Sequence, residues 1–96
     1  WVARNRDHVA RYKRNSNLMA KFGISIEEYD FLLAKQGGRC AICNSPPQRK
    51  HLAVDHDHKT NRIRGLLCSA CNTAIGSFWD NPNLLRAAAD YLEQWA

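Results

Sequence analysis

Two groups of residues in this 96-residue chain have the types and spacing to do chemistry. Thiolates bind zinc, imidazole moves protons near neutral pH, and carboxylate and amide oxygens bind hard divalent cations. The first group is Cys40, Cys43, Cys68 and Cys71, and the second is Asp55, His56, Asp57, His58 and Asn72. The first group suggests a zinc-stapled domain, and the second has the residue types that could hydrolyse a phosphodiester with one metal ion.

All four cysteines fall in two C-x-x-C motifs, a spacing that lets two thiolates bind one tetrahedral zinc from a tight turn. We therefore predict a structural zinc held by all four thiolates. Two disulfides or a redox dithiol are the alternatives. No signal peptide is visible, so an oxidising compartment has no support and an intracellular location is expected. Gly37 and Gly38 are expected to form a tight turn before the first motif.

The elements that must position these residues follow from periodicity and turn residues. A capping box at Ser25 and Glu28 starts one helix, and Pro82 at a first helical position starts the last one. The apolar stripe of that last helix has the spacing of a core-facing helix, so we expect Trp79 and Trp95 to pack inside. We expect helices over 3–22, 25–36, 69–76 and from 82 onward, and a β-hairpin of 52–56 and 62–67.

This order predicts a small α+β domain with a zinc-stapled ββα-metal, treble-clef-like core and flanking N- and C-terminal helices. We divide the chain into an N-terminal helical arm, residues 1–22, and a zinc-bound domain, residues 23–96. The chain begins with Trp, which suggests a fragment or a processed product. No apolar run approaches the length of a membrane span, so no membrane partner is expected.

The formal net charge of +5 lies entirely in the arm, since the rest of the chain carries equal numbers of basic and acidic side chains. A basic arm suits a polyanion such as DNA, with RNA not excluded. A solvated helix face is the alternative interpretation. The candidate nucleic-acid contacts in the arm are Arg4, Arg6, Arg11, Lys13 and Arg14.

The run Leu52 to His58, followed by Arg62 to Asn72, resembles the phage recombination endonuclease VII family, within the wider HNH or His-Me finger nucleases. The resemblance extends from about residue 29 to residue 76. It rests on two motifs that occur together in order, the four cysteines and D-H-D-H…C-N. It departs from the family at Ile75, where the phage resolvase has a glutamate.

The resemblance implies a role for each residue of the second group. His56 corresponds to the general base, Asp55 to the carboxylate that binds the catalytic metal, and Asn72 to its second ligand. Mg²⁺ or Mn²⁺ would suit these oxygens. His58 corresponds to a histidine that steadies the phosphate, and we add Arg64 as a further phosphate contact. If the strand is regular, Asp55 and His56 would face opposite flanks of a phosphate.

Each assignment has a structural alternative. His56 alone would more often be structural than catalytic, Asn72 could simply cap a helix or turn, and Asp57 is expected to be solvated. The alternative for the whole chain is a non-catalytic treble-clef zinc module that binds nucleic acid or protein. We favour a metal-dependent HNH endonuclease that nicks or cuts DNA, and a homodimer is left open.

Overall fold

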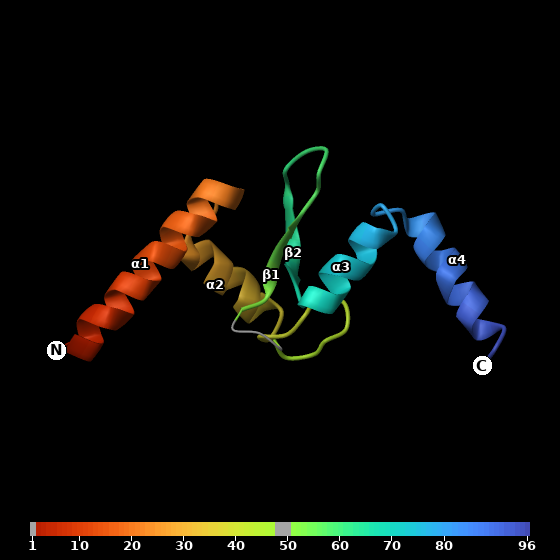
Figure 1. Ribbon diagram of the computed structural model, residues 1–96, viewed down its shortest axis with the longest axis horizontal. Helices are drawn as coiled ribbons and strands as arrows, with labels where there is room; N and C mark the ends of the chain where they lie inside the picture. The colour runs from red at the N-terminus through yellow and green to blue at the C-terminus, as the bar shows by residue number, and fades with distance from the viewer. Residues whose placement is uncertain (1, 48–50) are drawn as a thin grey trace.

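The computed structural model describes residues 2–47 and 51–96, with the side chains of the first helix described from Ala10 onward. Within these ranges it is a small α+β fold with four helices and a two-stranded sheet, as the sequence predicts (Figure 1). The termini lie at opposite ends of an elongated molecule of 59 × 29 × 20 Å. The elements in chain order are α1 (Val2–Phe22), α2 (Ile26–Lys35), β1 (Ala53–His56), β2 (Ile63–Leu67), α3 (Ser69–Ser77) and α4 (Pro82–Glu93).

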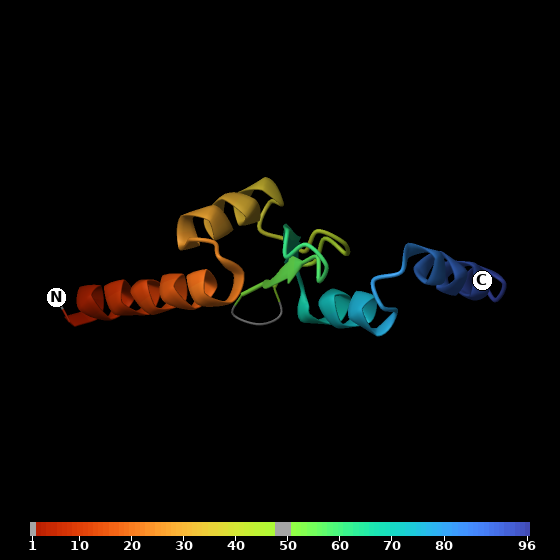
Figure 2. The same cartoon turned by 90° about the horizontal axis from the view of Figure 1, so that it is seen from above.

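The hairpin of β1 and β2 stands at the centre, with α1 and α2 on one side and α3 and α4 on the other (Figures 1 and 2). The strands are antiparallel, and their register shifts between Asp55 and His56. Asp55 pairs with Gly65 and His56 pairs with Ile63, so Arg64 is an extra residue on β2. Such a bulge twists the strand locally and re-aims a side chain. The extra residue lies on β2, opposite Asp55 and His56, which are consecutive residues of β1.

The core lies where α2, the foot of the hairpin and the first turn of α3 meet. Tyr29 is central, because its buried hydroxyl donates to the carbonyl of Leu52 at 2.6 Å while the Arg14 guanidinium lies 4.4 Å from its ring centroid. Leu18 of α1 also belongs to this core. The buried residues of the core are Leu18, Ile24, Ile26, Tyr29, Cys40, Leu52, Val54, Leu66, Leu67 and Cys68.

The start and the end of α2 follow the predicted local chemistry. The Ser25 side chain accepts from the Glu28 N–H, and Glu28 accepts from the Ser25 N–H, so the capping box is confirmed. Gly37 and Gly38 both have positive φ angles, and the Gly38 N–H donates to the carbonyl of Leu33 at 2.8 Å. This turn reverses the chain toward the first cysteine pair.

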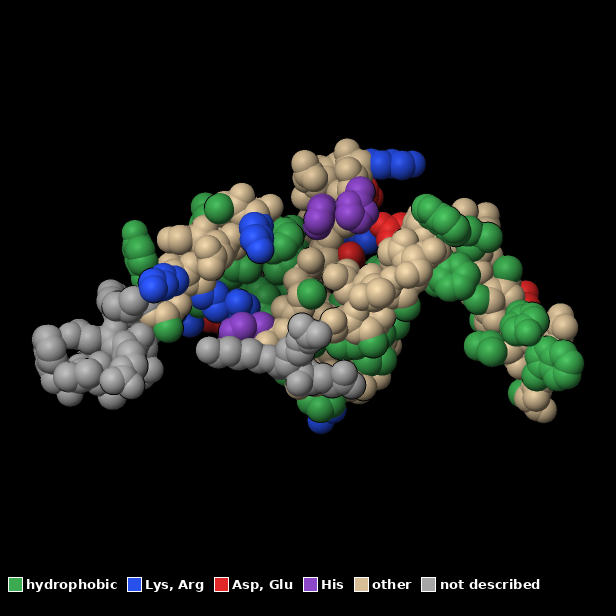
Figure 3. Space-filling view, in the orientation of Figure 1, with side chains coloured by type: hydrophobic (Ala, Val, Ile, Leu, Met, Phe, Trp, Pro, Cys, Tyr) green, Lys and Arg blue, Asp and Glu red, His purple; other side chains and the backbone are tan. Residues whose placement is uncertain are grey.

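The prediction that α4 packs its apolar stripe in the core is wrong. The helix begins with Pro82 and an Asn81 cap as expected, but it has no buried residue. Trp79 and Trp95 are 79% and 78% exposed, and the hydrophobic side chains of α4 stand on the surface of the space-filling view (Figure 3). Periodicity predicts that a helix has an apolar face, but it does not say what covers that face. No helix in the described part of the chain is long and apolar enough to cross a membrane.

Candidate functional site

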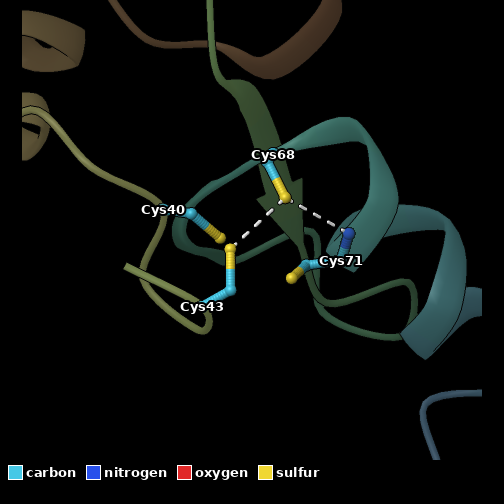
Figure 4. Close-up of side chains that lie close together, drawn as sticks. All are labelled: Cys40, Cys43, Cys68 and Cys71. Atoms are coloured by element: carbon cyan, nitrogen blue, oxygen red, sulfur yellow. Dashed lines mark hydrogen bonds between the residues drawn. The ribbon is translucent and has the colours of Figure 1, made fainter. Parts of the chain in front are cut away.

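The four cysteines converge on one point between the turn after α2 and the start of α3 (Figure 4). Their sulfur atoms all lie within 4.8 Å of one another, and those of Cys43 and Cys68 are 3.7 Å apart. A zinc ion bound tetrahedrally by four thiolates needs sulfur atoms about 3.8 Å apart. All four cysteines are free, so the disulfide alternative is wrong. The donor set and its spacing fit one zinc ion.

Each cysteine pair is prepared by its local backbone. The Ile42 N–H donates to the Cys40 sulfur at 3.4 Å, and Asn44 takes a left-handed conformation, with φ 61°, that closes the first turn. Cys68 is the N-cap of α3, and its sulfur accepts from the Cys71 N–H at 3.4 Å. Backbone N–H groups aimed at sulfur favour the thiolate, which is the form that binds metal.

The protonation of the thiols also fits a metal centre. Burial raises the pKa of Cys40, but backbone N–H groups, that of Cys68 first, outweigh burial and lower the pKa to about 6. Burial and the neighbouring sulfurs instead raise the pKa of Cys71 to about 12. Four thiols this close cannot all ionise without a cation among them, because like charges raise one another's pKa. A bound zinc would remove that restriction.

The second group of residues lies along the hairpin, around a buried carboxylate. Asp55 is 8% exposed, and both of its oxygens accept from Arg64: Oδ2 from Nε at 2.7 Å, and Oδ1 from Nη2 at 2.8 Å. Arg64 reaches Asp55 because the bulge makes it the extra residue on β2. The Asp55 hydrogen bonds raise the pKa of Arg64 above its ordinary value, against the effect of burial. The negative charge of Asp55, the predicted metal ligand, is thus balanced by the Arg64 guanidinium.

The same guanidinium contacts a second carboxylate that the sequence did not point to. Nη2 of Arg64 also donates to Oδ2 of Asp80 at 3.2 Å, and this oxygen lies 3.9 Å from Nε2 of His58. Asp80 follows α3 in a W-D-N-P stretch that reads only as a helix break before Pro82. Its approach to the hairpin depends on the angle at which the chain leaves α3, which no local motif records.

The two histidines of the run lie together beside these carboxylates. The ring centroids of His56 and His58 are 4.8 Å apart, and the ring of Phe22 is 5.8 Å from that of His56. His56 is half-buried, whereas His58 is exposed. The end of α1 therefore supplies one wall for the predicted base. In Figure 3 the histidine side chains of the hairpin gather next to acidic and basic ones.

Asn72 lies on α3, which contacts β1. Its backbone N–H donates to the carbonyl of Cys68 at 3.0 Å, while its half-buried side chain makes no hydrogen bond to another described residue. The alternative that the Asn72 side chain caps a helix or turn therefore has no support among the described residues. Its amide oxygen is available to a ligand.

Asp57 has the local role expected of a turn residue. Its Oδ1 accepts from the backbone N–H groups of Lys59 at 2.8 Å and Thr60 at 3.4 Å. The Lys59 hydrogen bond is the main reason why the pKa of Asp57 lies below its ordinary value. The carboxylate thus shapes the tip of the hairpin.

One pocket lies beside the hairpin tip, and a larger hollow lies between α1 and α2. A pocket of about 440 Å³ opens between the hairpin tip and the end of α3, and Arg64, His58 and Asp80 are among its lining residues. A larger hollow of about 810 Å³ lies between α1 and α2, away from Asp55. It is lined by basic side chains of α1. Three of them, Arg11, Lys13 and Arg14, were predicted from the sequence to contact nucleic acid, and the fourth is Lys21.

The basic side chains of α1 differ in the ion pairs and ring contacts that they make within the fold. Arg11 donates to Asp30 at 2.9 Å, and Arg14 lies over the Tyr29 ring. Lys13 and Lys21 make no ion pair with a described residue. The side chains of Arg4 and Arg6 lie outside the described residues. Lys13 and Lys21 thus have neither an ion pair nor a ring contact among the described residues, and both side chains are exposed to a polyanion.

A family model and two phage relatives each match most of this chain. The family model for recombination endonuclease VII matches residues 15–94. The Gene 59 protein of Mycobacterium phage D29 is 47% identical over 81 residues, which cover 82% of this chain and 49% of that protein. The Gene 59 protein of Mycobacterium phage L5 is 42% identical over 79 residues, which cover 80% of this chain and 48% of that protein. The chain thus spans about half the length of these relatives, and no solved structure matches it.

Proposed function

Because the chain belongs to the recombination endonuclease VII family, we propose that it is a metal-dependent endonuclease of the HNH type that hydrolyses phosphodiester bonds in DNA. One observation carries the proposal. A half-buried histidine and a buried carboxylate are consecutive residues at the end of β1, and α3, which bears Asn72 and Cys71 and is capped by Cys68, packs against that strand. The cysteines would hold zinc, which would join the start of α3 to the turn after α2.

In this proposal His56 is the general base. Histidine has an ordinary pKa of about 6.5, so its neutral imidazole can accept a proton from water near pH 7. The rings of Phe22 and His58 flank His56 and restrict its orientation. A positioned base of this kind contributes on the order of a hundredfold or more to the rate of hydrolysis.

Asp55 and Asn72 would hold a divalent cation, Mg²⁺ or Mn²⁺. A carboxylate and an amide oxygen are the ligands that these ions prefer, and the ions keep several coordination positions for water and phosphate. Asp55 is buried and paired with Arg64, so a cation bound there would have to share or replace the guanidinium as the positive charge that a buried carboxylate needs. Such an ion would supply positive charge to the phosphate and to the leaving oxygen.

Two further groups would bind the phosphate. His58 is exposed at the mouth of the pocket, and Arg64 offers a planar guanidinium that matches phosphate oxygens. The basic hollow between α1 and α2 would guide the nucleic acid toward the hairpin. The division into an arm, residues 1–22, and a nuclease domain, residues 23–96, is part of the proposal, and so is a homodimer.

The proposal is tested by incubating the zinc-loaded protein with supercoiled plasmid, with and without Mg²⁺ or Mn²⁺. We expect metal-dependent nicking or cutting that leaves 5′-phosphate and 3′-hydroxyl ends. His56→Ala should lower the rate about a hundredfold or more while zinc content and the circular dichroism spectrum stay unchanged. Asp55→Ala and Asn72→Ala should raise the metal concentration needed for the half-maximal cleavage rate. Added Mn²⁺ should restore part of the cleavage rate that these variants lose.

Asp57→Asn is the matched control, because it removes a carboxylate of the same hairpin but keeps an oxygen for the Lys59 and Thr60 N–H groups. Its cleavage rate should stay within about twofold of the parent. If His56→Ala cleaved as fast as the parent, or if the parent cleaved no DNA or RNA with either metal, the chain would instead be a zinc module that binds nucleic acid or protein.

A further inference from the structure

Asp80 occupies a backbone position that the surrounding fold must impose. It lies between α3 and α4, and both it and Trp79 have left-handed φ angles, 53° and 55°. Residues other than glycine adopt this region at a cost, although aspartate and asparagine tolerate it best. The Asp80 N–H donates to the carbonyl of Ile75 at 2.9 Å, which fixes the turn against the end of α3. The turn places the carboxylate at the hairpin, with its side chain 22% exposed.

The carboxylate of Asp80 shares one nitrogen atom with that of Asp55. Nη2 of Arg64 donates to Oδ1 of Asp55 at 2.8 Å and to Oδ2 of Asp80 at 3.2 Å, while Nε is bound to Asp55 alone. Arg64 is therefore a bridge between a more buried acceptor and a more exposed one. The bridge is asymmetric, because Asp55 takes two of the three hydrogen bonds.

A divalent cation at Asp55 would compete with Arg64 for the same two oxygens. Were Asp55 the only partner of Arg64, a cation would have to displace the guanidinium from every hydrogen bond that the structure gives it. With Asp80 present, Arg64 can shift toward the second carboxylate and keep a charged partner within the pocket. Displacing Arg64 from Asp55 then costs less free energy, and the guanidinium stays near the phosphate site.

We propose that Asp80 is a positioning residue that retains Arg64 when a divalent cation occupies Asp55. By receiving the guanidinium, Asp80 releases Asp55 for the cation and holds Arg64 where it can bind a phosphate oxygen. This inference rests on the proposed function, because it concerns the cation assigned to Asp55. It adds a role for a residue outside the D-H-D-H…C-N motif.

The inference is tested by the affinity of the zinc-loaded protein for Mn²⁺ without DNA, measured by calorimetry and by the electron paramagnetic resonance signal of free Mn²⁺. Asp80→Asn should weaken binding about fivefold, the scale of one charge-assisted hydrogen bond at a partly exposed site. Asparagine keeps the shape of the side chain and tolerates the left-handed backbone. Arg64→Gln should tighten binding, because it removes the competitor of the cation.

Two comparisons separate positioning from other roles of Asp80. Asp57→Asn removes one negative charge from the same pocket without touching Arg64, so it should change the Mn²⁺ affinity less than about twofold. In an Arg64→Gln background, Asp80→Asn should change the Mn²⁺ affinity no more than Asp57→Asn does, because that background has no guanidinium for Asp80 to bind.

Each other result would overturn the inference in a distinct way. Equal effects of Asp80→Asn and Asp57→Asn in the parent would mean that Asp80 acts only as a surface charge. A full Asp80→Asn effect in the Arg64→Gln background would mean that Asp80 contacts the cation directly. If the parent bound no Mn²⁺, the metal assignment of the proposed function would fall, and this inference with it.

Discussion

The side chain of Gln36 should contribute more to stability than any other amide in the described part of the chain. It lies at the C-cap of α2 and makes three hydrogen bonds. Its Oε1 accepts from the Leu66 N–H at 2.9 Å, and its Nε2 donates to the carbonyls of Leu66 at 2.9 Å and Arg39 at 2.8 Å. Leu66 is fully buried on β2, two residues before Cys68. The amide thus covers the open edge of the sheet next to the zinc site.

The cost of Gln36→Ala follows from which partners are left without a hydrogen bond. The carbonyl of Leu66 keeps the Ala41 N–H, 3.1 Å away, whereas the Leu66 N–H loses the acceptor that the structure gives it. An orphaned buried donor costs about 1–3 kcal/mol, and the lost bond to the Arg39 carbonyl adds roughly 0.5–1 kcal/mol. We expect a loss of about 2–3 kcal/mol, a large share of the roughly 5–15 kcal/mol typical of a domain.

Urea unfolding of the zinc-loaded protein measures this loss as a lower transition midpoint at an unchanged slope. Gln94→Ala is the matched control, because this amide is exposed at the C-cap of α4, and its effect should stay within about 0.5 kcal/mol. Gln36→Glu should also destabilise, since a carboxylate can accept from Leu66 but would face two carbonyl oxygens. If Gln36→Ala unfolded at the same urea concentration as Gln94→Ala, the edge-covering role would be refuted.

The remaining predictions concern the zinc site and the basic hollow. Elemental analysis should find one zinc per chain, and a strong chelator should unfold the domain, because metal binding in a core this small is largely folding free energy; intact disulfides in a mass spectrum, or a chelated protein that stays folded, would contradict this. Lys13→Ala combined with Lys21→Ala should weaken DNA binding and reduce the salt slope by about two, since each lysine at a phosphate releases about one counterion. Lys35→Ala, at the end of α2 and outside that hollow, is the control and should leave the slope unchanged.

The features that the sequence predicted well are those fixed by neighbours in the chain. The capping box at Ser25 and Glu28, the glycine turn at 37–38 and the Asn81-Pro82 start each depend on a few consecutive residues. The cysteine cluster joins distant segments, but its two C-x-x-C turns are local, and this spacing favours one shared metal. The ββα order could therefore be read before the structure was known.

The features that the sequence did not predict depend on contacts between segments that carry no motif. The bulge turns Arg64 toward Asp55, although an alternating strand would have predicted a different face for it. Gln36 reaches Leu66 across thirty positions, and Asp80 reaches Arg64 across sixteen. The sequence thus named the residues to which we assign the chemistry of a nuclease, while the structure shows that one of them, Asp55, shares the Arg64 guanidinium with Asp80. A motif indicates which groups react. The tertiary fold determines which counter-ions contact those groups before the reaction.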